Sequence, residues 1–171
     1  MKKTAVVVLV ACSLAAACGD NDTTAPTSLP LVFTAQLSPT NEVPPISNSE
    51  STARGAAQIS FNVTRNASNA ITAATATFYF QVLGLGGTTV VGAHIHSGPA
   101  GVNAPVVVST GLSAAAPLAL TSNAVEFTAS NISVDPALML SIIDNPAGFY
   151  FNVHTPANPG GVARGQLVRI R

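Results

Sequence analysis

Apolar and polar residues alternate in short runs along most of this chain, and a period of two residues is typical of β-strands. The runs are bounded by Gly, Pro, Asn, Asp and Ser, the residues that favour turns. The pattern predicts strands at 31–38, 56–63, 71–83, 90–96, 105–110, 125–132, 148–154 and 162–170. Many short strands separated by turns favour an all-β fold, either a β-sandwich or a Greek-key barrel.

One segment departs from this alternation. Asp135 is a good N-cap residue, and Pro136 would occupy the first helical position, where proline is well tolerated. The pair Asn145-Pro146 then ends the segment. We therefore expect one short helix near 135–145 that crosses between strands.

The N-terminus has the features of an export leader. A positive start is followed by an apolar stretch that is too short to span a bilayer permanently, so residues 1–17 are predicted to be a lipoprotein signal peptide. Cys18 is the predicted lipidation site, with Cys12 as the alternative, and residues 18–30 are a polar, proline-containing tether. The acyl chains would anchor an exported domain, residues 31–171, to a membrane at the periplasm or the cell surface.

The charged residues argue against nucleic acid as a partner. Only 8% of the residues are charged, both lysines belong to the leader, and the five arginines are scattered along the chain. The two cysteines also lie in the leader, so the exported domain is predicted to have no disulfide.

All three histidines lie in two segments that are predicted to be strand ends. His94 and His96 are two residues apart and must point to the same face of their strand. For the same reason, Tyr150, Asn152 and His154 share one face of the second strand. If the two strands are neighbours, the three imidazole rings converge on one polar patch.

This patch allows two interpretations. His94, His96 and His154 could bind Zn or Cu, since imidazole suits both metals, with Glu42, Tyr150 or Asn152 in a supporting role. Alternatively, the histidines form a structural cluster that holds the carbonyl groups of nearby loops. No nucleophile elbow and no pair of catalytic carboxylates stands out, so no catalytic residues are predicted.

Three groups of motifs resemble the CHRD domain, a module named after chordin that also occurs singly in exported bacterial proteins. The motifs are Phe-Thr-Ala-Gln-Leu-Ser at 33–38 with Asn-Glu-Val-Pro-Pro at 41–45, Ala-His-Ile-His-Ser-Gly-Pro-Ala-Gly at 93–101 with Pro-Val-Val at 105–107, and Gly-Phe-Tyr-Phe-Asn-Val-His-Thr at 148–155 with Asn-Pro-Gly-Gly at 158–161 and Arg-Gly-Gln-Leu at 164–167. The resemblance implies an immunoglobulin-like β-barrel with distant similarity to copper/zinc superoxide dismutases.

The chain departs from the family pattern before Arg164, where the family usually has an acidic residue and this chain has Val162-Ala163. The charge partner of Arg164 is therefore open at this stage, and a salt bridge or a carbonyl clamp within the fold is expected for it. Dismutase activity is disfavoured, because the copper/zinc enzymes need six histidines and this chain has three.

The sequence thus predicts a lipid-anchored, non-enzymatic binding or structural module of the cell envelope, with a protein or glycan as a possible partner. A metal-binding protein that uses the three histidines is the alternative.

Overall fold

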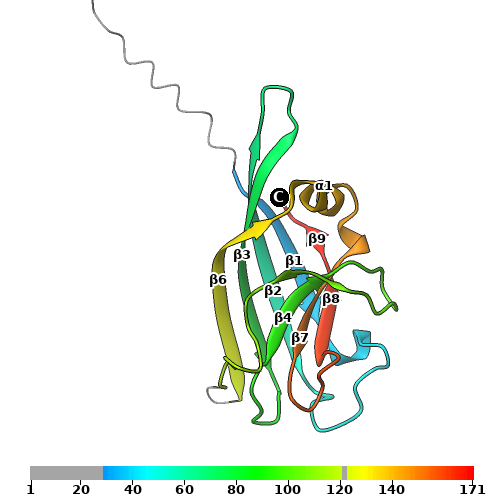
Figure 1. Ribbon diagram of the computed structural model, residues 1–171. Helices are drawn as coiled ribbons and strands as arrows, with labels where there is room; N and C mark the ends of the chain where they lie inside the picture. The colour runs from blue at the N-terminus through cyan, green and yellow to red at the C-terminus, as the bar shows by residue number, and fades with distance from the viewer. Residues whose placement is uncertain (1–28, 121–122) are drawn as a thin grey trace, which may run out of the picture.

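The computed structural model describes residues 29–120 and 123–171, which form a two-layer β-sandwich (Figure 1). One antiparallel sheet has the strand order β6-β3-β2-β1-β9, and the other has the order β5-β4-β7-β8. The strands are β1 (Leu31–Leu37), β2 (Arg54–Arg65), β3 (Ile71–Leu83), β4 (Gly92–His96), β5 (Val106–Ser109), β6 (Ala124–Val134), β7 (Tyr150–His154), β8 (Ala163–Gln166) and β9 (Val168–Arg169). The all-β prediction is confirmed.

The helical segments are short. The predicted helix is α1 (Pro136–Asp144), and the Asp135 side chain accepts hydrogen bonds from the amides of Ala137 and Leu138 at its N-terminus, as the sequence suggested. Two 3-10 turns are also present, η1 (Pro39–Asn41) and η2 (Pro146–Gly148). Within the described residues, none of the helices is long and apolar enough to cross a membrane.

Alternation along the strands separates an apolar core from a polar face. The core side chains of the two sheets meet where Phe151 of β7 packs against Phe78 and Phe80 of β3, with ring centroids 5.9 and 5.5 Å apart. All three rings are fully buried. Removing one such ring from a packed core costs about 3–5 kcal/mol, so these contacts hold the two layers together.

The last predicted strand, 162–170, is wrong as a single element. The chain forms β8 in the smaller sheet, passes through the buried residue Leu167, and then forms β9 beside β1 in the larger sheet. The backbones approach closely at this crossing, because a Cβ placed on Gly165 would lie 2.1 Å from the carbonyl oxygen of Gln36. Side-chain periodicity does not say which strand lies beside which, so it could not show the change of sheet.

Candidate metal centre

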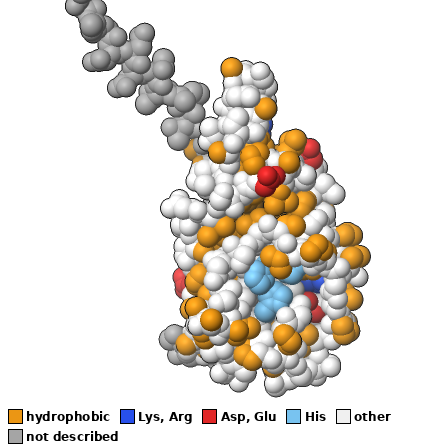
Figure 2. Space-filling view, viewed as in Figure 1, with side chains coloured by type: hydrophobic (Ala, Val, Ile, Leu, Met, Phe, Trp, Pro, Cys, Tyr) orange, Lys and Arg blue, Asp and Glu red, His pale blue; other side chains and the backbone are white. Residues whose placement is uncertain are grey.

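Strand register brings the three histidines together on the face of the smaller sheet that points away from the core. β4 and β7 are antiparallel neighbours, with Gly92 opposite His154 and His94 opposite Asn152. One ring nitrogen from each of His94, His96 and His154 lies within 4.8 Å of the others. The histidine side chains form one continuous patch at the molecular surface (Figure 2).

A glycine makes room for the three rings. Gly92 lies on the same face of β4 as His94 and His96, and a Cβ placed there would lie 2.9 Å from Cε1 of His94 and 3.5 Å from Cδ2 of His154. A side chain at this position would therefore displace the ring of His94, whereas its distance to His154 is that of an ordinary van der Waals contact. Sequence reasoning missed Gly92, although its spacing of two residues before His94 was a usable signal.

Two of the histidines are oriented by loop carbonyl groups. Nδ1 of His96 lies 2.8 Å from the carbonyl oxygen of Ala104, and Nδ1 of His154 lies 3.0 Å from that of Pro159. A carbonyl oxygen can only accept a hydrogen bond, so Nδ1 carries the hydrogen in both rings and Nε2 keeps its lone pair. The carbonyl contacts expected from the structural interpretation are present at His96 and His154, and metal binding by the cluster stays a prediction.

One nitrogen of each ring is buried and has no partner among the described residues. These atoms are Nε2 of His96, Nε2 of His154 and Nδ1 of His94. Buried polar atoms are satisfied in the large majority of cases, so three such nitrogens in one cluster are unusual.

Burial keeps the three rings neutral. It lowers the pKa of His154 to about 4, with a further contribution from the neighbouring histidines, and it lowers the pKa of His94 and His96 below the ordinary value. A hydrogen bond to a backbone carbonyl opposes this effect in His96 and His154. At neutral pH all three imidazoles are in the form that binds metals.

The side chain of Arg164, in β8, forms hydrogen bonds with the loops beside the histidines. Its Nε donates to the carbonyl oxygen of Asn41 at 2.6 Å, and its Nη1 donates to the carbonyl oxygen of Val102 at 3.2 Å and to Oδ1 of Asn103 at 3.0 Å. Its charge partner is Glu42, with 3.7 Å between Nε and Oε2. This chain has no acidic residue just before Arg164, and Glu42, from a loop far away in the sequence, is the charge partner instead.

Tyr150 lies between Arg164 and His96. The ring of His96 stacks on Tyr150 with 4.8 Å between centroids, and the guanidinium carbon of Arg164 lies 4.6 Å from the tyrosine centroid. The tyrosine oxygen accepts a hydrogen bond from the amide of Ala104 at 3.2 Å. These contacts make Tyr150 a positioning residue for His96.

Glu42 is a buried acid beside this group. Burial raises its pKa to about 7, although the positive charge of Arg164 and the side chain of Asn152 both act to lower it. In the described part of the chain, the group of possible metal ligands consists of the three histidines and contains no carboxylate. Glu42, Tyr150, Asn152 and Arg164 therefore surround the cluster rather than complete it.

Glu50, a second buried acid, was missed by sequence reasoning. Its carboxylate accepts hydrogen bonds from the side chains of Thr88, Thr155 and Asn158, and the distance to Oγ1 of Thr155 is 2.6 Å. Glu50 therefore ties the loop after η1 to the loop that follows His154. The sequence carried no signal for this network, because its members are far apart in the chain.

The predicted leader, including Cys12 and Cys18, lies outside the described residues. Its role in export and lipidation remains a prediction.

The family model for the CHRD domain matches residues 33–167 of the chain. No significant match exists among curated proteins or solved structures. The matched range runs from β1 to the residue that separates β8 from β9, and it includes every residue of the histidine cluster and its surroundings.

Proposed function

The chain belongs to the CHRD domain family, and on this premise we propose that it is a binding module whose ligand is a transition metal ion, Zn²⁺ or copper. His94, His96 and His154 would be the ligands. The observation that carries this proposal is that three neutral imidazoles each place one ring nitrogen within 4.8 Å of the others, and that each ring also has a buried nitrogen without a partner among the described residues.

The surroundings of the cluster fit a metal site. Histidines that bind metals almost always donate their other ring hydrogen to a carboxylate, a carbonyl or a water, and His96 and His154 donate to carbonyl oxygens. Nitrogens around a tetrahedral Zn²⁺ lie about 3.3 Å apart, given Zn–N bonds of about 2.0–2.1 Å. Small ring rotations would bring the nitrogens from within 4.8 Å of one another to that spacing.

The donor set also limits the chemistry. Three neutral nitrogens without a thiolate suit Zn²⁺ or copper better than Mg²⁺ or Ca²⁺, which prefer oxygen ligands. Three protein ligands leave at least one coordination position for water or another small molecule, as in catalytic rather than structural zinc sites. A bound ion would supply Lewis acidity in the case of zinc, or one-electron chemistry in the case of copper.

We further propose that the module acts at the cell envelope. The positive start and apolar stretch of residues 1–17 support export, and Cys18 with the polar tether supports attachment by acyl chains. Mass spectrometry of the protein recovered from a membrane fraction tests this proposal. A diacylglyceryl group on Cys18 is expected, and a soluble protein whose mature chain carries no lipid would refute it.

The metal proposal is tested by elemental analysis and calorimetry on the purified full chain. We expect about one equivalent of Zn²⁺ or Cu²⁺ and a corresponding rise in the melting temperature, since a ligand at 100 times its Kd stabilises by about 2.7 kcal/mol. The absence of both metal and binding heat in wild-type protein would refute the proposal.

His94→Ala is the most informative variant. No hydrogen bond to a loop carbonyl is present at His94, whereas His96 and His154 each hold one. His94→Ala should therefore lower metal affinity by tenfold or more while leaving both loop attachments in place. His96→Ala and His154→Ala should lower metal affinity and also reduce stability without metal, so a comparison of the three variants separates ligation from folding.

A further inference from the structure

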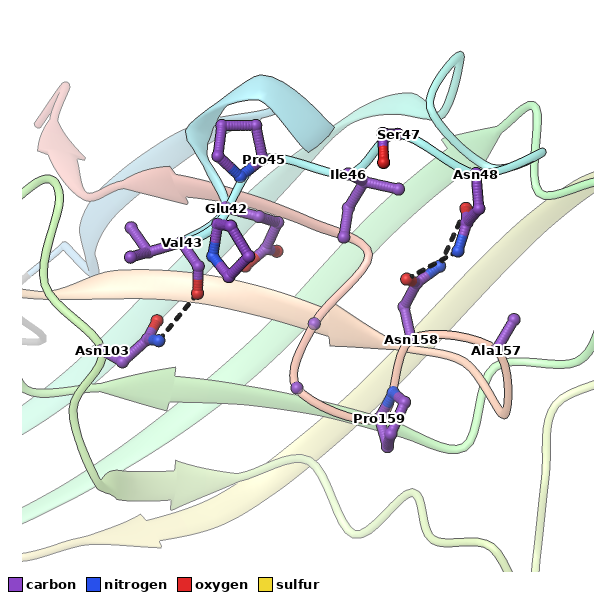
Figure 3. Close-up of a pocket in the computed structure, with 13 residues that line it drawn as sticks. Glu42, Val43, Pro45, Ile46, Ser47, Asn48, Asn103, Ala157, Asn158 and Pro159 are labelled. Atoms are coloured by element: carbon purple, nitrogen blue, oxygen red, sulfur yellow. Dashed lines mark hydrogen bonds between the residues drawn. The ribbon is translucent and has the colours of Figure 1, made fainter.

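Two loops at one end of the sandwich enclose a hollow of about 350 Å³ that the metal proposal does not use (Figure 3). Residues 42–48 form one wall, residues 157–161 form the opposite wall, and Asn103 lies beside the first wall. This volume is near the lower end of the range for small-molecule sites, about 300–1,000 Å³, so it suits one small chemical unit.

The walls of the hollow are fixed by hydrogen bonds at both ends. Nδ2 of Asn103 donates to the carbonyl oxygen of Val43 at 2.8 Å, and Nδ2 of Asn48 donates to Oδ1 of Asn158 at 3.0 Å. Asn158 in turn donates to the buried carboxylate of Glu50. Proline at 44, 45 and 159 further restricts the backbone of both walls. A site formed in advance loses little entropy when a ligand binds.

Glu42 provides an unsatisfied acceptor at this hollow. Its side chain belongs to the first wall, next to Val43 (Figure 3), the residue is 4% exposed, and its Oε1 atom has no hydrogen-bond partner among the described residues. Oε2 of the same carboxylate faces Arg164. Because a buried acceptor without a donor is costly, Oε1 favours a ligand that brings an N–H or O–H group.

The charges around the hollow favour an uncharged ligand that donates a hydrogen bond. The lining contains no lysine or arginine, so an anion would find no counter-charge there. Glu42 faces Arg164, and burial raises the pKa of Glu42 to about 7, so a cation would meet little net negative charge there. Val43, Ile46 and the three prolines offer C–H surfaces beside the carboxylate. The unpartnered acceptor, the low net charge and the C–H surfaces together favour a ligand with a hydroxyl group on a compact, partly apolar ring.

We propose that this hollow is a binding site for a neutral saccharide unit, with a sugar hydroxyl donating to Oε1 of Glu42 and the C–H face of the sugar packing against the proline-rich walls. This site is separate from the histidine cluster and goes beyond the metal-binding function, since none of the three histidines lines the hollow.

The test is an NMR titration of the full chain, labelled with ¹⁵N, in the presence of a chelator. The probes are methyl glucoside, methyl mannoside and N-acetylglucosamine, with inorganic phosphate and ethylammonium as charged comparisons. We expect saturable shifts of the amides of Ser47, Asn103 and Gly160 with at least one neutral sugar, in the millimolar range. Measuring without metal keeps the result independent of the metal proposal.

Two variants test the contact and the cavity separately. At pH 8, where the Glu42 carboxyl is ionised, Glu42→Gln should weaken sugar binding about fivefold, since a charge-assisted hydrogen bond is replaced by a neutral one. The exposed Glu126→Gln is the matched control. Gly160→Leu should abolish binding while the fold is kept, because a Cβ at this lining position meets no atom within 4 Å. Ala67→Leu, at an exposed position in the hairpin between β2 and β3, is its control.

The proposal is overturned if no neutral sugar gives saturable shifts up to about 100 mM. It is also overturned if Gly160→Leu binds as well as wild type, or if phosphate or ethylammonium binds more tightly than every neutral sugar. Should Glu42→Gln fail to fold, the Gly160→Leu comparison still decides the outcome.

Discussion

Replacing Glu42 with glutamine should make the stability of the protein depend more steeply on pH. Glu42 and His154 are both buried beside the smaller sheet, and burial shifts their pKa values toward each other's ordinary range. The pKa of Glu42 is raised from 4.5 to about 7, and that of His154 is lowered from 6.5 to about 4. The two groups therefore act on stability in opposite senses over the same range of pH.

The sign for each group follows from which state of the chain binds the proton more tightly. The unfolded chain protonates His154 more readily than the folded protein does, so the contribution of His154 is fully present above pH 6.5 and is lost as the pH falls to about 4. The folded protein protonates Glu42 more readily, so the contribution of Glu42 is fully present below pH 4.5 and is lost as the pH rises to about 7.

The pKa shifts of Glu42 and His154 change the free energy of unfolding by similar amounts. Each pKa unit corresponds to about 1.4 kcal/mol, so each group changes the free energy of unfolding by about 3 kcal/mol across its own range. In the wild-type protein these two changes oppose each other between pH 4.5 and 6.5. In Glu42→Gln the opposing contribution of Glu42 is absent, and His94 and His96 act in the same direction as His154.

The assay is urea unfolding at several values of pH between 4 and 7.5, with a chelator present so that no metal competes with protons. The free energy of unfolding of Glu42→Gln should rise by about 3 kcal/mol from pH 4 to 6.5, while Glu126→Gln should follow the wild-type curve. A flat profile for Glu42→Gln would show that burial does not hold His154 neutral, and the reasoning about the cluster would be wrong.

Three further predictions test the arrangement. Gly92→Ala should lower metal affinity at least tenfold in calorimetry, because the added methyl group displaces the ring of His94. Unchanged affinity would contradict the packing described for the cluster. Phe151→Ala should lower the free energy of unfolding in urea by about 3–5 kcal/mol, since the Phe151 ring packs against the opposite sheet. A loss below about 1 kcal/mol would contradict this role. Zn²⁺ at a concentration near the wild-type Kd should slow hydrogen exchange in residues 97–105 and 155–161 more in the wild-type protein than in His94→Ala, because a metal on Nε2 strengthens the Nδ1–H bonds to the two loops. Equal slowing in both proteins would refute this link.

Local signals predicted most of the secondary structure. The bounds expected for 71–83 are those of β3, because apolar and polar residues alternate from Ala74 to Val82 and glycines follow shortly after. The helix was predicted because Asp135 caps the orphan amides of the first turn and Pro136 needs no intrahelical partner. Such features depend only on neighbours in the chain.

The change of sheet after β8 could not be predicted in this way. Strand periodicity fixes which side chains share a face, but it does not say which strand lies beside which. The crossing at Leu167 depends on the close approach of Gly165 to Gln36, which is far away in the sequence.

The same distinction holds for the candidate site. The shared face of His94 and His96 follows from their spacing, whereas the position of His154 depends on the pairing of β4 with β7. The acid that pairs with Arg164 comes from a loop more than a hundred residues earlier, and no local pattern connects them. Backbone carbonyl groups, which orient two of the rings, have no sequence signature at all.

The passage of the chain from β8 to β9 also limits how the described domain could aggregate. The backbone of Gly165 lies against that of Gln36, so the outer border of β8 is already covered, and β9 is only two residues long. The borders that remain for strand addition are β5, with four residues, and β6, whose register shifts beside Asn131 with φ near 59°. β5 is too short, and β6 too irregular, for an incoming strand to extend either sheet regularly. This protects an all-β domain rich in apolar residues from edge-to-edge association.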